Sequence, residues 1–285
     1  NNRGDIAFDV DVIGGENTSG VWYAANATQG RIVYRSPIEG RLISDPSLNN
    51  KGDLAFSQFD FGVTDGVFKF DSNTRATTLV IRPEQNQAFS FSSINDIGTV
   101  VTRVVDSNRD RSYRYVNGGV ARVLVKEGVK DSKGVTLSHL YRPVLNNTGF
   151  VAAKVRRGEI GQNDESQPDA IRLWKPDGSY DVIAVDINAD ANSLFLGFGN
   201  SVGISDAKHI VFVATISGDK QAVFLYGEGK IKAVAIEGQG DLDAIEAFAP
   251  VVNSKGLVAF RGRLKSGKSA IFTGTWDGFK AIAKQ

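Results

Sequence analysis

Apolar and polar residues alternate along most of the chain, in runs of four to eight positions that Gly, Asn and Asp separate. Successive side chains of a β-strand point to opposite faces of the sheet, so this period of two indicates strands rather than helices. The pattern therefore predicts an all-β protein made of short strands and tight turns.

A second pattern repeats over a longer distance. About every 50 residues an Asn or Ser is followed by small polar residues, then a Gly and an apolar strand, and this happens six times. In the fifth copy Lys208 replaces the Gly, so we expect either a left-handed Lys or a turn of different shape. The six copies occupy residues 1–8, 48–56, 94–101, 145–152, 204–212 and 252–260.

The last copy shows most clearly how a repeat is arranged. It predicts strands at 249–252, 257–264, 269–275 and 279–283. Four antiparallel strands per repeat are typical of a propeller blade, in which neighbouring blades cover both faces of each sheet.

The repeats predict a single domain over residues 1–285, a six-bladed β-propeller with four-stranded antiparallel blades. The chain opens after the point where the first blade should have its first strand, so we expect this blade to be incomplete at its N-terminus. The predicted blades are approximately 1–36, 37–82, 83–126, 127–185, 186–237 and 238–285.

The repeats resemble those of the tandem-repeat propellers found in extracellular and anchored bacterial proteins. Their shared pattern runs from a Gly-containing linker through N-x-x-G-x-[VIL]-A-F to a strand with G-[VI]-F, and residues 236–240 with 248–260 match it nearly throughout. Residues 126–128 with 143–149 match it well. The resemblance spans the chain and rests on structural residues. It implies the fold and an extracellular or envelope location, but no activity.

Composition excludes several classes of function. The 33 basic and 32 acidic residues leave a net charge of +1, too little to attract nucleic acid or anionic lipid over the whole surface. No Cys is present, which excludes disulfides, thiolate metal sites and Cys nucleophiles. The longest apolar stretch, 209–216, is far shorter than the ~20 residues of a membrane span. Because the chain begins at Asn1 and lacks Met, we expect a processed or partial form of a longer protein.

One linker has the spacing of a calcium-binding loop. Asp186, Asn188, Asp190 and Asn192 supply side-chain oxygens at positions one, three, five and seven. Gly197 at position twelve excludes an EF-hand, so the prediction is a looser Ca²⁺ site. The alternative, favoured for this composition, is a solvated polar turn.

Two other segments are candidates for ligand binding. The acidic residues Asp241, Asp243 and Glu246 form a linker at the equivalent place in the next blade, where they are expected to meet Asp186 and Asp190 on one rim. Arg156 and Arg157 open a long insert of mixed charge in the fourth blade. Such an insert is expected either to bind a partner or to form only a mobile hairpin tip.

Residues for catalysis are few. The two His residues, His139 and His209, occupy unlike blade positions, so no Ser-His-Asp arrangement and no three-histidine zinc site can be argued. Paired carboxylates could hydrolyse a glycoside if they lay ~5–9 Å apart. The sequence does not show this separation.

The sequence therefore predicts a non-catalytic extracellular or envelope module that binds a glycan or a protein partner through loops on one face. One alternative is a hydrolase or lyase acting on a polysaccharide, with carboxylates around the channel and Ca²⁺. A second is an architectural module of a larger anchored protein. Two carboxylates converging with an Arg or His on one pocket, with pKa values displaced in opposite directions, would favour the enzyme.

Overall fold

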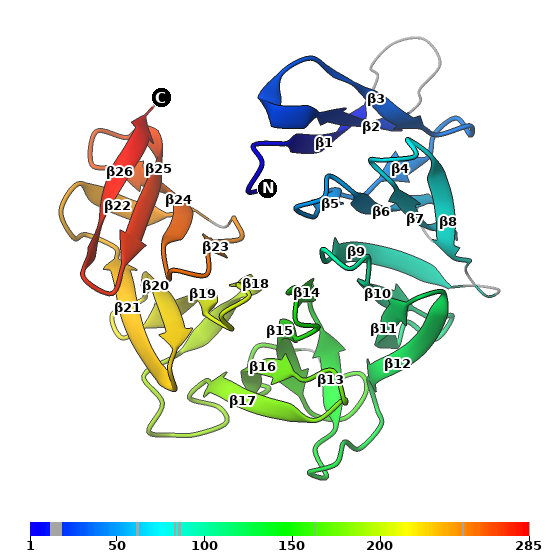
Figure 1. Cartoon of the computed structure of the whole chain (residues 1–285). Coiled ribbons are helices and arrows are strands. Elements are labelled where there is room, and N and C mark those ends of the chain that lie inside the picture. The colour runs from blue at the N-terminus through cyan, green and yellow to red at the C-terminus, as the bar shows by residue number, and fades with distance from the viewer. Residues whose placement is uncertain are drawn as a thin grey trace. The chain divides into compact units, whose positions relative to one another are not determined.

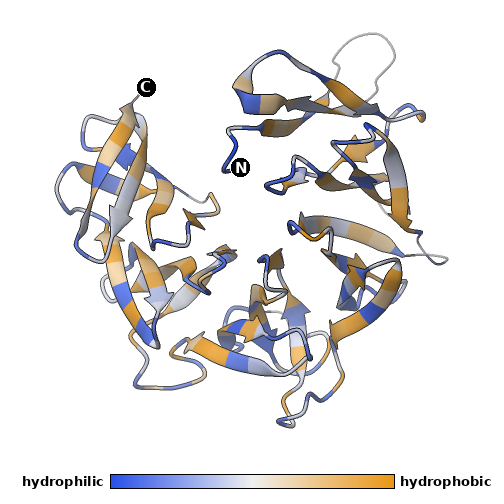
Figure 2. Cartoon of the chain, viewed as in Figure 1, coloured by the Kyte–Doolittle hydropathy of each residue, from blue (hydrophilic) through white to orange (hydrophobic). Residues whose placement is uncertain are grey.

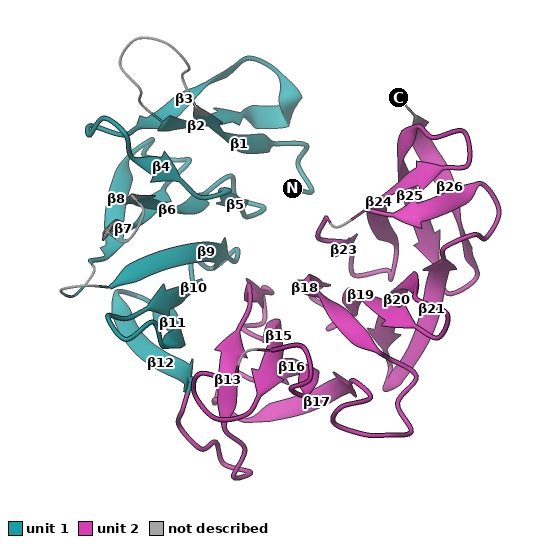
Figure 3. Ribbon diagram, turned by 180° about the vertical axis from the view of Figure 1, so that it is seen from behind, with its two compact units in different colours: residues 1–127 teal, residues 128–285 magenta. Residues whose placement is uncertain are grey.

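The computed structural model describes residues 1–11, 19–60, 63–82, 84, 87–162, 164–246 and 248–284. Among these residues the secondary structure is β-strand, apart from one short 3-10 turn, η1 (Ala25–Ala27). No helix of the described part is long and apolar enough to cross a membrane. The chain forms two compact units, Asn1–Glu127 and Gly128–Gln285 (Figure 3), and each contains three antiparallel sheets (Figure 1).

The first unit begins with a three-stranded sheet. The other sheets all start with a strand that precedes the Asn-x-x-Gly turn, or its Ser-x-x-Lys variant, and the first sheet lacks this strand, as predicted. The first sheet contains β1 (Ile6–Asp11), β2 (Ser19–Ala24) and β3 (Gly30–Arg35); the second contains β4 (Leu42–Ile43), β5 (Ser47–Leu48), β6 (Leu54–Asp60), β7 (Val63–Phe70) and β8 (Thr77–Ile81); the third contains β9 (Ala88–Ile94), β10 (Val100–Val105), β11 (Arg111–Asn117) and β12 (Val120–Lys126).

The second unit repeats the same order of strands. Its fourth sheet contains β13 (Leu137–Leu140), β14 (Val144–Leu145), β15 (Val151–Arg157), β16 (Asp169–Trp174) and β17 (Tyr180–Val185); the fifth contains β18 (Gly197–Ile204), β19 (Ile210–Ile216), β20 (Lys220–Gly227) and β21 (Lys230–Ile236); the sixth contains β22 (Leu242–Ile245), β23 (Val251–Val252), β24 (Val258–Leu264), β25 (Ser269–Thr275) and β26 (Gly278–Lys284).

The first strand of three sheets is split into two short pieces, and the sixth sheet shows why the prediction missed this. β22 and β23 both pair with β24. The predicted strand at 249–252 is only Val251–Val252, and the predicted acidic linker contains β22 instead. Leu242 and Ile245 are buried in the core while Asp243 between them is exposed, so the apolar pattern was too short to recognise as a strand.

The Asn of the repeat motif closes its own turn and joins one sheet to the next. Asn49 Oδ1 accepts hydrogen bonds from the backbone N–H groups of Lys51 and Asp53, both at 2.9 Å. Asn49 Nδ2 donates to the carbonyl oxygen of Asn95 in the third sheet, at 2.9 Å. We call this second contact an amide bridge. Asn1 makes it to the carbonyl of Asn49 (2.7 Å), and Asn146 makes it to that of Ser205 (3.0 Å).

The fifth copy of the motif departs from this arrangement. Lys208 adopts φ = 62°, so the left-handed alternative expected from the sequence is correct. Its Nζ lies 4.7 Å from the centre of the Phe150 ring, a cation–π contact that offsets part of the backbone cost. Ser205 accepts a hydrogen bond from His209 N–H but carries no amide with which to make the bridge.

The A-F and [VI]-F parts of the motif are partners across neighbouring strands. Phe260 of β24 lies directly opposite Phe272 of β25, and their rings stack with centroids 5.3 Å apart. Phe56 with Phe68, and Phe212 with Phe224, form the same stacked pair in the second and fifth sheets. Such pairs stabilise an antiparallel sheet and fix its register.

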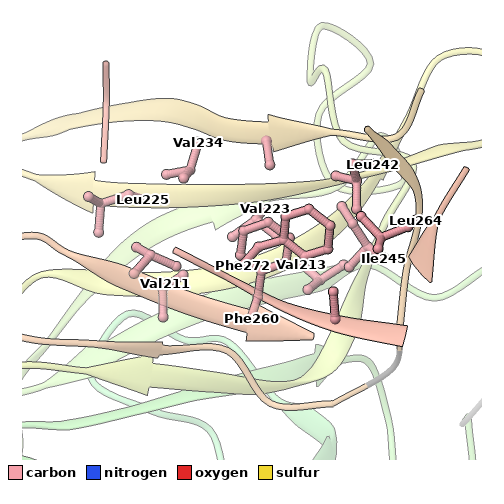
Figure 4. Packing of buried hydrophobic residues seen from close by; sticks show 13 residues of the cluster. Val211, Val213, Val223, Leu225, Val234, Leu242, Ile245, Phe260, Leu264 and Phe272 are labelled. Atoms are coloured by element: carbon pink, nitrogen blue, oxygen red, sulfur yellow. The ribbon is translucent and has the colours of Figure 1, made fainter. Parts of the chain in front are cut away.

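The core lies between consecutive sheets of each unit, and the turns are mainly hydrophilic (Figure 2). Figure 4 shows the cluster between the fifth and sixth sheets, where Val213 and Val223 face Phe260 and Phe272. Burial of apolar side chains between consecutive sheets is the main source of stability, since each large apolar side chain contributes about 1.5–3 kcal/mol.

Candidate functional site

A bulge in β18 shapes the candidate site. Phe198 pairs with Ala214 of β19, and the next pair is Val202 with Phe212, so three residues of β18 (199–201) lie opposite the single residue between those partners. A bulge interrupts the hydrogen-bond ladder and redirects side chains, and bulges are common beside functional sites. This one faces charged residues of the fourth sheet.

Lys154 and Arg156 project from β15 toward this bulge. They are two positions apart, so they lie on one face of the strand. Arg156 forms a two-pronged ion pair with Asp169 of β16, with Nε–Oδ1 at 2.8 Å and Nη2–Oδ2 at 3.0 Å. Lys154 Nζ lies 3.0 Å from Asp169 Oδ2 and donates to the carbonyl of Phe198 (2.9 Å) and to Asn200 Oδ1 (3.3 Å).

A second carboxylate, Asp186, follows β17 and is only 1% exposed. Its oxygens accept hydrogen bonds from the backbone N–H of Ala189 (3.1 Å) and from Asn188 Nδ2 (3.3 Å). Burial raises the pKa of the Asp186 carboxyl, and the negative charge of Asp169 raises it further. Burial lowers the pKa of the Lys154 amine, an effect that Asp169 opposes.

These groups line a pocket of about 250 Å³. We define the charged pocket by its six charged residues, Lys154, Arg156, Glu165, Asp169, Asp186 and Asp219. The side chains of Leu196, Phe198 and Thr215 complete the wall. Two cations therefore face four carboxyl groups, and the pocket offers both donors and acceptors to a polar ligand.

Two of the predicted site residues meet in this pocket, although the sequence assigned them to different sites. Arg156 was expected in the insert and Asp186 in the calcium loop, and both line the charged pocket. Asn188 Nδ2 also donates to the carbonyl of Glu165, at 3.1 Å, so the linker and the insert are in contact.

The side chains of the predicted calcium loop serve its turn. Asp190 is exposed, and its Oδ1 accepts a hydrogen bond from Asn192 N–H at 2.9 Å. Asp186 and Asp190 thus accept hydrogen bonds from within the linker, as Asp residues do in polar turns, and the Ca²⁺ site stays a prediction. Across the described residues, no three or more His, Cys, Asp or Glu side chains form a group that could hold a metal ion.

The remaining predicted ligand residues lie outside the charged pocket. Arg157 follows Arg156 on β15 and therefore projects from the opposite face. Asp243 pairs with Arg263 (Nε–Oδ2 3.0 Å), and Glu246 pairs with Arg261 and accepts a hydrogen bond from Ser269 Oγ at 2.7 Å. Asp241 lines a separate pocket beside Phe279. These three acidic residues belong to the sixth sheet and its approach, and none of them lines the charged pocket.

Sequence reasoning missed Lys154 and Asp169. A usable signal was present, because Lys154 is a single charge inside the apolar run 150–155, and Asp169 opens the apolar strand β16. A charged residue in a strand that is otherwise buried must find a partner, so such positions mark polar clusters.

Comparison with known proteins identifies a family and a fold. The family model of DUF7453, a family of unknown function, matches residues 1–277. No curated protein matches the sequence. The fold is similar to TolB from Acinetobacter baumannii, with a TM-score of 0.59 and 15% identity over 99% of this chain and 64% of that one. This chain thus spans just under two thirds of the TolB chain.

Two enzymes have a similar fold. Oligogalacturonate lyase from Vibrio parahaemolyticus has a TM-score of 0.61 and 11% identity over 93% of this chain and 71% of that one. Virginiamycin B lyase from Staphylococcus aureus has a TM-score of 0.55 and 10% identity over 99% and 89% of the two chains. At these identities the likeness concerns the fold alone, which is all-β and of propeller type.

Proposed function

Because the chain belongs to the DUF7453 family of unknown function, we propose a function from the site: a non-catalytic glycan-binding β-propeller, with the charged pocket as its recognition site. In this proposal the six sheets are six blades of one propeller, the first with three strands. The sixfold motif and the propeller-type neighbours support this architecture.

We place the protein outside the cell or in the envelope. The likeness to TolB and the resemblance of the repeats to those of extracellular bacterial propellers support this location. The lack of Cys is compatible with it, since such a chain needs no control of its redox state.

One observation carries the binding proposal. Lys154, Arg156, Asp169 and Asp186 are each at most 6% exposed, yet all four line a pocket that opens to solvent. Buried ion pairs add little net stability, because removing two charges from water offsets most of their attraction. A buried charged cluster that adds little stability and lines a cavity is better explained by recognition of a polar ligand than by a structural role.

The charges of the pocket restrict the ligand. Four carboxyl groups face two cations, and Asp169 already occupies both cations. A further anion would meet net negative charge, whereas a neutral hydroxyl-bearing ring or an amino sugar would not. We therefore favour neutral or amino sugars over the acidic sugars that give oligogalacturonate lyase its name.

A glycan array with neutral, amino and uronic acid sugars tests this preference for neutral or amino sugars. Titration calorimetry then measures the affinity for each glycan that binds. Lys154→Met keeps the length of the side chain but removes the donor, and losing a hydrogen bond from a charged group weakens binding roughly 10–100-fold. Lys175→Met, at an exposed Lys that pairs with Asp181, is the matched control and should bind as the wild type does. Unchanged binding by Lys154→Met would contradict the proposal.

A polysaccharide lyase or hydrolase is the second candidate, and one observation favours it. Asp186 has a raised pKa and Lys154 a lowered pKa within one pocket, and such a pair can donate and accept a proton. New reducing ends or unsaturated products from a bound glycan, lost in Asp186→Asn while binding persists, would establish the enzyme. If no glycan binds or reacts, the architectural module becomes the reading to pursue.

A further inference from the structure

A second pocket adjoins the charged pocket along β18. It measures about 310 Å³ and lies between the β18 bulge and residues 248–250 of the sixth sheet. We call it the Phe248 pocket. Phe198 and Thr215 line both pockets, and Lys154 Nζ donates to Asn200 of the second pocket. The two pockets are therefore neighbours with shared walls.

The lining of the Phe248 pocket combines an aromatic ring with uncharged polar groups. Phe248 is 56% exposed, so its ring is accessible to a ligand. The guanidinium of Arg261 lies 4.5 Å from its ring centre, and Arg261 is itself paired with Glu246. This stack supports the ring from one side, so Glu246 contributes to the pocket indirectly.

Across from the ring stand amide and hydroxyl groups. Thr215 of β19 and Gln221 of β20 are direct cross-strand partners, and Asn200 and Ser201 come from the bulge. Among the described residues, none of those that line this pocket carries a charge. Amides and hydroxyls both donate and accept hydrogen bonds, which suits vicinal hydroxyl groups. The C–H face of a sugar ring packs well on an aromatic ring.

The volumes indicate a ligand larger than one ring. Pockets that bury a small organic ligand measure roughly 300–1,000 Å³. The charged pocket, at about 250 Å³, falls short of this range, and the Phe248 pocket, at about 310 Å³, lies at its lower end. A ligand that fills both adjoining pockets is therefore larger than one that fills either.

We propose that the Phe248 pocket is a second sugar subsite and that the ligand is an oligosaccharide. This inference rests on the proposed function. A neutral sugar stacks on Phe248 and bonds to Asn200, Thr215 and Gln221. The sugar linked to it enters the charged pocket beside Lys154.

The test compares each glycan hit with its monosaccharide by titration calorimetry. The wild type should bind the disaccharide or a longer chain at least tenfold more tightly than the monosaccharide. Phe248→Ala should abolish this gain. The control is Val251→Ala, which shortens an equally exposed apolar side chain of the same segment outside the pocket and should keep the gain.

Gln221→Ala provides a second variant that leaves the aromatic ring in place, and it should reduce the same gain. The subsite is overturned if the wild type shows no gain with chain length, or if Phe248→Ala retains it. Loss of monosaccharide binding in Lys154→Met together with an unaffected Phe248→Ala would reject only the subsite. Unchanged binding in Lys154→Met would reject the charged pocket and, with it, the oligosaccharide site.

Discussion

At the scale of single residues, the motif Asn has two separable effects on stability. In the copies that begin at Asn1, Asn49 and Asn146, Oδ1 closes the turn and Nδ2 makes the amide bridge. The Gly three residues later adopts the left-handed backbone conformation that closes the turn, as Gly52 does at φ = 91°. The closed turn brings the backbone N–H groups within reach of the Asn side chain. The spacing of the motif follows from this geometry.

We expect Asn49→Ala to destabilise the protein by about 3 kcal/mol, because it removes four side-chain hydrogen bonds and leaves buried backbone groups without a partner. Asn253→Ala is the matched control. Asn253 is exposed and closes the same turn through Lys255 and Leu257, so its loss should cost only about 1 kcal/mol. Urea unfolding measures both, and equal losses would mean that the bridge contributes nothing.

Asp186 makes stability depend on pH. Its pKa in the folded protein is raised above the ordinary 3.8, so the folded state holds this proton more tightly than the unfolded state. As pH rises from 3.8 through the raised value, the wild type should lose stability relative to Asp186→Asn, by about 1.4 kcal/mol per unit of pKa difference.

Unfolding by urea at pH 4, 5.5 and 7 checks this dependence. The exposed Asp181→Asn variant controls for removal of a surface carboxylate. If the stability of the wild type relative to Asp186→Asn stays constant or increases as pH rises, burial does not govern this carboxyl group.

At the scale of elements, the β18 bulge is where a regular strand becomes part of the wall of the proposed binding site. The surplus of two residues over the partner strand turns Asn200 toward Lys154 and opens the ladder beside both pockets. The strands on either side of the bulge remain paired. The site therefore depends on a local irregularity that the rest of the sheet tolerates.

Deleting residues 200 and 201 should restore a regular β18–β19 ladder, because removing two residues preserves the alternation of faces. We expect a folded protein with an unchanged circular dichroism spectrum and no glycan binding. Asn200→Ala with Ser201→Ala keeps the bulge and removes only side chains, so it should weaken binding without abolishing it. Wild-type affinity in the deletion variant would show that the bulge has no part in the site.

Strands were easier to predict than their interruptions. The alternation of apolar residues and the paired Phe positions, such as Phe260 and Phe272, have a local cause that the sequence displays. The break between β22 and β23 has no such local cause, because it depends on which side chains the neighbouring sheet can bury.

At the scale of the whole molecule, the repeat predicted the fold while the site arises from differences between repeats. Lys154 of the fourth sheet contacts Phe198 and Asn200, which lie 44 and 46 residues further along the chain. No local pattern encodes a contact between neighbouring repeats. Arg156 was predicted as the start of a polar insert and Asp186 from the spacing of a calcium loop. Both belong to the fourth sheet or its end, where β16 between β15 and β17 brings them to one pocket.

The amide bridge also bears on how such a chain can grow. Asn49 both makes and receives this bridge, because its side chain donates to Asn95 of the following sheet while its backbone carbonyl accepts from Asn1. A segment built in this way is complementary to a copy of itself placed head to tail. Duplication of the gene segment would thus create a new interface without further mutation. Ser205 shows how a copy of the motif can differ. Its backbone carbonyl accepts the amide bridge from Asn146, but its side chain has no amide with which to donate one to the next sheet.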